Sequence, residues 1–471
     1  MNPEQIVERA NQLRWNLPQN FHDRWVENIH AESSRIASRN VDHKGTTRRL
    51  VWQRRLDWLL TNRWTGMPIM VFMLGLVLWI TIIGANVPSG WLATLLLDNG
   101  HPFLKHLTEL AHFPWWLSGL LVDGLYLTTA WVVSVMLPPM AIFFPMFTLL
   151  EDFGYLPRVA FNLDNLFRKA GAHGKQALTM SMGWGCNAAG VVATRVIDSP
   201  RERLIAIITN NFALCNGRWP TQILIATVFL GVLAPPMLAG LVSAASVLSI
   251  ALLGVLLTFV SSWMLSRTVL KGEASTFTLE LPPYRPPNIL RTLYTSLIDR
   301  TLIVLWRAIV FAAPAGVVLW GICNLKVGDA SIAHWLVDVL NGPGWIIGLN
   351  GVILVAYIVA IPANEIVIPT VLMLTVMTTG VTGVGEQGAG VMFETSENSM
   401  LATLLHAGGW TTLTAVCLML FSLCHNPCST TIYTIWKETK SLKWTLVATL
   451  MPIAFGIIIC GTVAFVWRLF T

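Results

Sequence analysis

The sequence predicts an all-α polytopic membrane protein, and composition carries that prediction. Hydrophobic residues make up 54% of the 471-residue chain and charged residues only 12%, whereas a soluble domain carries about 25% charged residues. The mean hydropathy is +0.61. The 21 tryptophans suit the headgroup depth of a bilayer, where amphipathic rings gather. We therefore expect about eight transmembrane helices of about 20 residues each.

Residues 1–64 are predicted to form a cytoplasmic, amphipathic helical linker. Arginines cluster before the first apolar run, at Arg48, Arg49, Arg54, Arg55 and Arg63. Arginine next to a span marks the cytoplasmic side, so we place the N-terminus inside. No apolar stretch typical of a cleavable signal peptide occurs there.

Apolar periodicity predicts eight spans, and their order sets the expected topology. They cover residues 66–87, 117–137, 204–230, 237–265, 302–325, 345–377, 411–436 and 444–467. Both termini would then be cytoplasmic, but Lys437, Lys440 and Lys443 would lie outside, against the positive-inside tendency. If residues 411–436 instead form a re-entrant hairpin, these lysines return inside and the C-terminus moves out.

Four helix-breaking interruptions lie inside apolar runs, two in each half of the chain. They are residues 183–187 (GWGCN), 215–220 (CNGRWP), 362–369 (PANEIVIP) and 424–428 (CHNPC). Irregular backbone at membrane depth persists only where protein buries it or where it lines a wet cavity. Paired interruptions of this kind point to a transporter built from inverted repeats, with its site where the repeats meet.

The residues at these breaks are suited to a metal ion. Cys186, Cys215 and Cys428 each sit beside a break, and Asn187 and Glu365 would add oxygen ligands. Thiolates favour transition metals over Ca²⁺ or Mg²⁺, although ligand type does not name the metal. A single buried cysteine is more often a small core residue, but three beside breaks favour a site.

Further polar residues in apolar surroundings are candidate pathway residues. They are Asp123, Glu151, Asp152, Asn216 and Cys424. Ionisable groups inside spans are costly and therefore usually functional. For Glu151 and Asp152 a solvated helix end explains the residues equally well.

A series of motifs from about residue 64 to the C-terminus resembles one family. The motifs are LEDFGY (150–155) with Asp164, HGK (173–175), GWGCN (183–187), ATR (193–195), RER (201–203), Cys215 with Arg218 and Pro220, ELPPYR (280–285), NEIV (364–367) and Pro427-Cys428. Together they resemble the membrane domain of ferrous iron transport protein B (FeoB). The resemblance implies a first gate repeat at about 117–231, a cytoplasmic loop at about 267–300, a second gate repeat at about 302–436, and Fe²⁺ as substrate. It also implies that Cys186, Cys215 and Cys428 contact the metal.

The chain departs from this family in ways that bear on function. The family begins with a GTPase domain, and no G-x-x-x-x-G-K-[ST] phosphate loop occurs here. The gate motifs also differ: Ala188-Ala189 replaces Val-Pro, Asn216-Gly-Arg-Trp replaces Ser-Ala-Arg-Leu, and Asn364 replaces the lysine before Glu365.

We therefore expect an inner-membrane transporter of Fe²⁺ that is not itself an enzyme and needs no cofactor. The expected partners are membrane lipid, the metal ion, a separately encoded GTPase and small Feo accessory proteins, with no nucleic acid. Homo-oligomerisation stays open. The alternatives are a nucleotide-independent carrier of Mn²⁺ or Zn²⁺ and a gate-fold assembly partner that no longer transports.

Overall fold

The computed structural model shows an almost entirely helical chain. It describes residues 21–40, 48–235, 237–271, 288–328, 330–380 and 398–470, together with residues 9, 284, 391 and 392. Three segments lie wholly or mostly outside the described residues. They are the first 20 residues of the predicted linker, the motif at 280–285, and the acidic segment with Glu386, Glu394 and Glu397.

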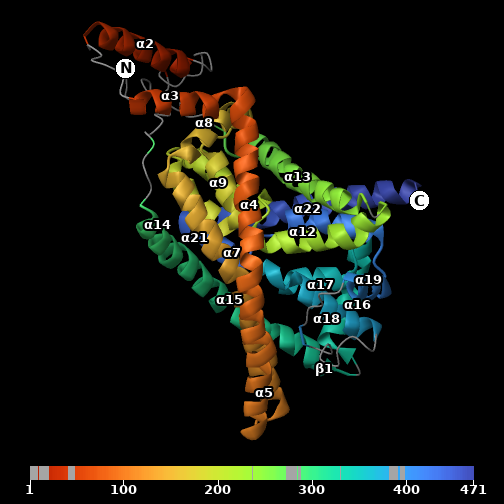
Figure 1. Ribbon diagram of the computed structural model, residues 1–471. Helices are drawn as coiled ribbons and strands as arrows, with labels where there is room; N and C mark the ends of the chain where they lie inside the picture. Colours follow the sequence, from red (N-terminus) through yellow and green to blue (C-terminus); the bar gives the residue numbers. More distant parts are fainter. Residues whose placement is uncertain are drawn as a thin grey trace.

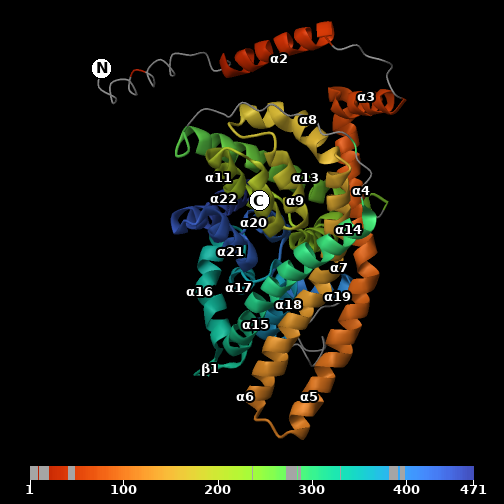
Figure 2. The ribbon, with the colours of Figure 1, turned by 90° about the vertical axis from the view of Figure 1, so that its left-hand side faces the viewer.

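A long helical hairpin forms the edge of the molecule, and two shorter helices precede it (Figures 1 and 2). The elements are α2 (Phe21–Asn40), α3 (Arg48–Thr61), α4 (Arg63–Ala93), η1 (Thr94–Gly100), α5 (His101–Leu110), α6 (Trp115–Ser118), η2 (Gly119–Tyr126) and α7 (Leu127–Asp152). Asn62 begins α4 by accepting a hydrogen bond from the backbone N–H of Trp64, which satisfies one of the free donors at a helix start. The hairpin turns between Leu110 and Trp115, and α4 packs along α7.

A first series of elements follows α7 and contains the first two breaks. It comprises α8 (Tyr155–Lys169), α9 (Gln176–Gly185), α10 (Asn187–Ala193), η3 (Thr194–Val196), α11 (Pro200–Thr209), η4 (Asn210–Phe212), η5 (Asn216–Arg218), α12 (Trp219–Ile225), η6 (Ala226–Leu230), η7 (Gly231–Leu233) and α13 (Ala239–Arg267). The breaks separate α9 from α10 and α11 from α12.

A second series contains the other two breaks. It comprises α14 (Ile289–Thr295), η8 (Ser296–Leu302), α15 (Ile303–Asn324), a hairpin of β1 (Lys326–Val327) and β2 (Ala330–Ser331), α16 (Ile332–Ile346), α17 (Gly351–Val359), η9 (Asn364–Ile366), α18 (Val367–Thr379), α19 (Asn398–Ala407), α20 (Thr412–Cys424), α21 (Ser429–Thr439) and α22 (Leu442–Phe470). In the hairpin, antiparallel β1 and β2 pair Lys326 with Ser331.

The two series repeat the same order of elements. When α7 is counted as the long helix that opens the first series, each series has a long helix, a connecting helix, a helix pair broken in the middle, a second broken pair and a closing long helix. The second series also contains α19, which has no counterpart in the first. The backbone at the breaks agrees as well. Cys186 has φ −151° and ψ 122°, and Ala363 has φ −151° and ψ 120°. Cys215 has φ −76° and ψ 164°, and Cys428 has φ −63° and ψ 159°. This agreement is what an internal repeat requires.

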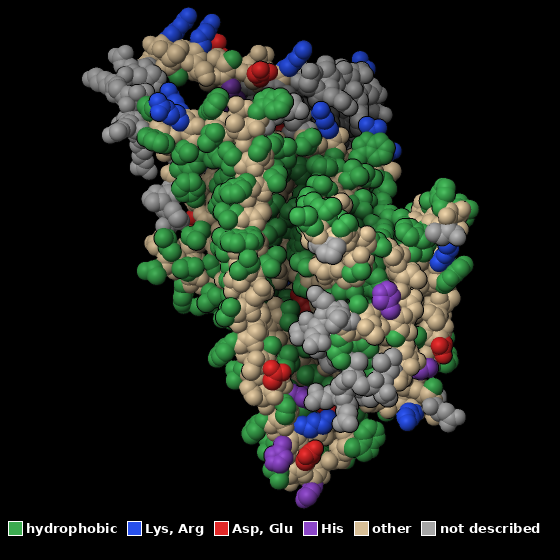
Figure 3. Space-filling view, turned by 45° about the vertical axis from the view of Figure 1, so that its right-hand side comes forward, with side chains coloured by type: hydrophobic (Ala, Val, Ile, Leu, Met, Phe, Trp, Pro, Cys, Tyr) green, Lys and Arg blue, Asp and Glu red, His purple; other side chains and the backbone are tan. Residues whose placement is uncertain are grey.

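Six helical runs of the described chain are long and apolar enough to span a membrane, or seven if the bent pair α16 and α17 is one span. The number is lower than the eight expected because two expected spans are divided: residues 204–230 form short helices around Cys215, and residues 345–377 are divided around Pro362. Figure 3 shows side chains of the hydrophobic class over the middle of the molecule, with charged and histidine side chains gathered toward its two ends. The all-α, polytopic prediction is confirmed.

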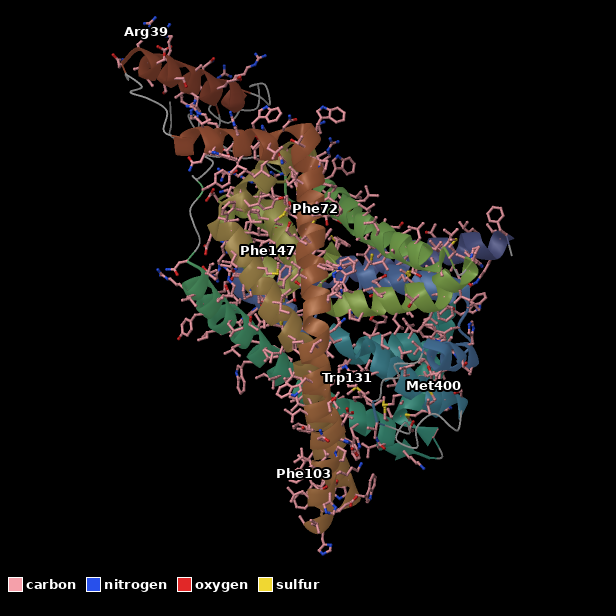
Figure 4. The ribbon with its side chains drawn as sticks, viewed as in Figure 1. Arg39, Phe72, Phe103, Trp131, Phe147 and Met400 are labelled. Atoms are coloured by element: carbon pink, nitrogen blue, oxygen red, sulfur yellow. The ribbon has the colours of Figure 1, made fainter. Side chains whose placement is uncertain are left out.

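The described residues form three hydrophobic core clusters, and α7 contributes to two of them. Trp131 packs in the largest cluster with α17, α18 and α20, whereas Phe147 packs in a second with α4 and α8 (Figure 4). A third joins α8, α11, α13 and α22. The helix α7 therefore connects the edge hairpin to both series.

Arg158 joins three segments at one end of the molecule. Its Nε donates to Asp57 Oδ1 over 3.0 Å, its Nη1 donates to Gly154 O over 2.7 Å, and its guanidinium lies 4.2 Å from the centre of the Tyr284 ring. The Arg158 side chain is 2% exposed. It therefore fixes α3 and Tyr284 against α8.

Glu438 places the end of α21 beside the basic segment that precedes α11. It forms ion pairs with Arg195 and with Arg203, the latter over 2.7 Å. Lys437 and the start of α22 therefore lie on the same face as these arginines. The run Thr412–Thr439 is itself one of the six that are long and apolar enough to span a membrane.

Candidate metal site

The four breaks meet at one small cavity of about 30 Å³. It is lined by Met136, Met140, Gly185, Cys186, Asn187, Cys215, Asn216, Gly217, Val304, Ala308, Pro362, Ala363, Asn364, Glu365, Cys428, Thr430 and Thr431. That volume holds a bare ion or one to two water molecules (about 10–15 Å³ of such volume suffices for one). All five residues predicted to bind metal, and Asn216 of the predicted pathway, line it.

The first break lies directly after Gly185, where α9 packs closely on α7. A side chain at Gly185 would come within 2.5 Å of the Phe143 ring, so only glycine lets α9 pack this closely on α7. Cys186 then adopts an extended conformation, and its backbone N–H still bonds Met182 O at 3.0 Å. Its thiol is thereby presented between two half-helices.

The second break is organised by a buried guanidinium. Arg218 is 2% exposed, and its Nη1 and Nη2 atoms donate five hydrogen bonds of 3.0, 3.0, 3.1, 2.9 and 3.1 Å. The acceptors are Asn211 O, Leu423 O, Asn211 Oδ1, His425 O and Asn426 O. The carbonyls freed by the break after α20 are therefore satisfied from the break before α12. The sequence placed Arg218 only in a family motif and gave no sign of this role.

The third break brings its carboxylate against the second. A Cβ at Gly217 would come within 2.5 Å of Glu365 Cδ, so the Glu365 side chain occupies the space that a side chain at 217 would need. Asn364 Nδ2 lies 4.0 Å from Cys215 Sγ, while its buried Oδ1 accepts no hydrogen bond in the described part of the chain. An amide oxygen without a partner is suited to a cation, and no local pattern in the sequence marks Asn364 as a ligand.

The fourth break is fastened to the third. The Ser429 backbone N–H donates to Ile361 O over 2.8 Å, and Cys428 Sγ lies 3.2 Å from Thr431 Oγ1. Cys428 and Glu365 thus reach the cavity from one series, and Cys186 and Cys215 reach it from the other.

The cavity offers thiols, thioethers, hydroxyls, amides and one carboxylate. Met136 and Met140 contribute the thioethers. Their four-residue spacing across Pro138-Pro139 is the sign in the sequence that could have identified them. Within the described residues no three His, Cys, Asp or Glu side chains are arranged to hold a metal ion. A bound ion would need side-chain or backbone movement, or oxygen ligands from Asn364 and the threonines.

The remaining predicted pathway residues lie away from the cavity. Asp123 is paired with His101 Nε2 at 2.7 Å and with Lys105 Nζ at 2.6 Å near the hairpin turn. Glu151 faces Arg300 at 3.6 Å, and Asp152 accepts a hydrogen bond of 2.7 Å from Thr292.

Cys424 is 1% exposed and belongs to the largest hydrophobic cluster, so it is a core residue. The distortion introduced by Pro427 separates it from Cys428 and the cavity lining.

Two family models match the chain. Residues 133–230 match "Gate: Nucleoside recognition", and residues 247–299 match "Ferrous iron transport protein B C terminus". The first match covers both breaks of the first series.

Curated relatives extend the similarity over most of the chain. "Fe(2+) transporter FeoB" of Staphylococcus aureus (strain MSSA476) is 27% identical over 85% of this chain and 57% of that protein. The protein of that name from Campylobacter jejuni is 25% identical over 87% of this chain and 64% of its own. The Salmonella typhimurium (strain LT2) protein is 33% identical over 50% of this chain and 29% of its own. The chain thus spans less than two thirds of these relatives, and no solved structure matches it significantly.

Proposed function

Because the chain is homologous to Fe(2+) transporter FeoB proteins over 85% of its length, we propose that it carries Fe²⁺ inward across the plasma membrane. The observation that carries this proposal is the meeting of four broken segments at one cavity lined by Cys186, Cys215, Cys428 and Glu365. Ligation requires thiolates, so binding releases protons and weakens as the pH falls.

The division of ligands between the two series supplies a release mechanism. Cys186 and Cys215 belong to the first series, and Glu365 and Cys428 to the second. Movement of one repeat against the other is the usual basis of alternating access. Such a movement would separate the two pairs of ligands and lower the affinity for the ion.

The N-terminal helices support a docking role for a separate GTPase, with the N-terminus cytoplasmic. On α2, Trp25, Ile29 and Ile36 are 59%, 49% and 53% exposed and recur at helical spacing on one face. Figure 2 shows α2 lying apart from the helical body. An apolar stripe of this kind fits a groove on a partner protein.

Anaerobic binding by the purified chain tests the site without depending on an energy source. We expect Cys186→Ser, Cys215→Ser and Glu365→Gln each to weaken Fe²⁺ binding by about tenfold or more, by analogy with removing a metal-orienting group. Cys323→Ala, a buried cysteine on α15 away from the cavity, is the control. Wild-type affinity in all three site variants would overturn the assignment.

Uptake into liposomes separates the remaining alternatives. The chain alone, under an imposed gradient, is offered Fe²⁺, Mn²⁺ and Zn²⁺ in parallel. Saturable uptake excludes a non-transporting role, and its preference among the ions identifies the substrate. Deleting residues 1–40 tests the GTPase: unchanged partner-dependent uptake in that variant would contradict docking on α2.

A further inference from the structure

A second, larger cavity of about 610 Å³ lies next to the metal cavity and opens between helices of both series. It is lined by residues of α7, α8, α9, α10, α15 and α21. All of these except α10 are labelled in Figure 2. Val304 lines both cavities. We call this larger space the basic groove.

The floor and walls of the basic groove are apolar. They are formed by Phe144, Leu156, Leu178, Met182, Ala188, Ala189, Val192, Ala193, Val196, Ile303 and Val304. Ile303 is 45% exposed, and Trp306, on the same face of α15 one turn later, is 67% exposed. An exposed isoleucine and tryptophan on a spanning helix face lipid, so the groove adjoins the bilayer.

The rim carries four cationic and two acidic side chains: Arg195, Arg300, Arg307, Lys437, Glu151 and Glu438. Both acids are already engaged. Glu438 pairs with Arg195 and also with Arg203 from outside the groove. Glu151 faces Arg300 at 3.6 Å.

Arg307 and Lys437 are the two rim cations that do not pair with Glu151 or Glu438. The Arg307 guanidinium lies 5.9 Å from the centre of the Tyr433 ring, and among the described ion pairs neither Arg307 nor Lys437 has a carboxylate partner. Two unneutralised cations at the edge of a low-dielectric groove favour an anion strongly.

We propose that the basic groove binds an anionic phospholipid, with its phosphate on Arg307 and Lys437 and an acyl chain along the apolar wall. Basic pockets between spanning helices recognise anionic headgroups in this way. A free phosphate would use the rim but leave the apolar wall exposed to water, whereas a phospholipid satisfies both surfaces. Charge complementarity and the apolar lining together select the lipid.

The position of the site suggests what the lipid contributes. An ion that leaves the metal cavity past Val304 meets the positive potential of Arg307 and Lys437. A headgroup phosphate would offset that potential and lower the barrier for a cation. Lipid binding itself does not depend on the proposed transport function, so the two are tested separately.

The purified full chain, stripped of lipid in detergent, is offered equal amounts of phosphatidylglycerol and phosphatidylcholine, and bound lipid is measured by native mass spectrometry. We expect wild type to prefer phosphatidylglycerol, and Arg307→Gln with Lys437→Gln to lower that preference by about tenfold. Arg267→Gln with Lys443→Gln removes the same charge outside the groove and should leave the preference intact.

A third variant tests the acyl part of the site. Val192→Trp fills the wall without changing charge, and we expect it to reduce retention of phosphatidylglycerol. Equal retention in wild type and the Arg307/Lys437 variant would overturn the proposal. So would displacement of phosphatidylglycerol by equimolar inorganic phosphate, which would identify a free-anion site.

Discussion

The Glu365 carboxylate fills the space beside Gly217 that any other residue would need for its side chain. A Cβ there would come within 2.5 Å of Glu365 Cδ. The two residues are far apart in sequence and belong to different repeats. Their contact brings the two halves of the chain together at the cavity.

Gly217→Ala should therefore displace Glu365 and weaken metal binding. Overpacking of this kind costs about 1–3 kcal/mol. The matched control is Gly240→Ala, where an added Cβ meets nothing within 4 Å. Anaerobic Fe²⁺ titration of both variants measures the effect, and equal affinities would show that Glu365 is not part of the site.

Arg218→Lys should destabilise the fold although it retains the charge. A lysine cannot donate in the planar fork that reaches the five acceptors around Arg218, and breaking such a buried network costs roughly 3–5 kcal/mol. Arg267→Lys on α13 is the control. The midpoint of thermal unfolding in detergent should fall only for the first variant; an unchanged midpoint would mean that those carbonyls find other donors.

Cys424 and Cys428 should behave oppositely although they lie four residues apart. Cys424→Ala removes a buried core side chain and should lower stability by about 1 kcal/mol while leaving metal affinity unchanged. Cys428→Ala should weaken metal binding, because Cys428 lines the cavity. The paired measurement is thermal unfolding and Fe²⁺ titration, and a loss of affinity in Cys424→Ala would return that residue to the site.

His173 should make stability depend on pH. It lies in the turn before α9, where burial lowers the pKa of His173 below its ordinary value of 6.5; Glu202, Lys175, Asp198 and Arg168 are the charged groups around it. The neutral ring accepts a hydrogen bond of 3.0 Å from the Lys175 backbone N–H. The unfolded chain takes up the proton first, so stability is full above pH 6.5 and falls as the pH drops toward the folded pKa.

His173→Asn keeps an acceptor but does not titrate, and it should flatten this dependence. Thermal unfolding between about pH 7.5 and pH 5.5 compares the two chains. Parallel curves would show that His173 does not contribute.

The protein class, the four broken segments and most residues of the cavity lining could be predicted from the sequence. Helix breakers and polar residues inside apolar runs can be recognised locally, which is why Cys186, Cys215, Cys428 and Glu365 could be selected together. The divided spans were harder, because residues 204–230 and 345–377 are apolar enough to span and only their packing shows where they bend.

Other features depend on contacts between distant segments. The sequence shows Arg218 only as part of a motif, and its hydrogen bonds to the loop at His425 become visible only in the folded chain. The two partners of Asp123, His101 and Lys105, lie on α5, across the helical hairpin. The burial of Cys424 follows from the turn at Pro427. None of these relationships has a local pattern that predicts it.

The Arg158 contacts set how the linker can act on the membrane region. Because one guanidinium is shared by Asp57, Gly154 O and the Tyr284 ring, α3 cannot be pulled away without removing the carboxylate from a buried cation. Such a cation is costly to leave alone, so α8 would follow α3. The next helix, α9, ends at Cys186. Movement of a partner bound to the N-terminal helices would therefore be transmitted through α8 and α9 to Cys186 at the small cavity.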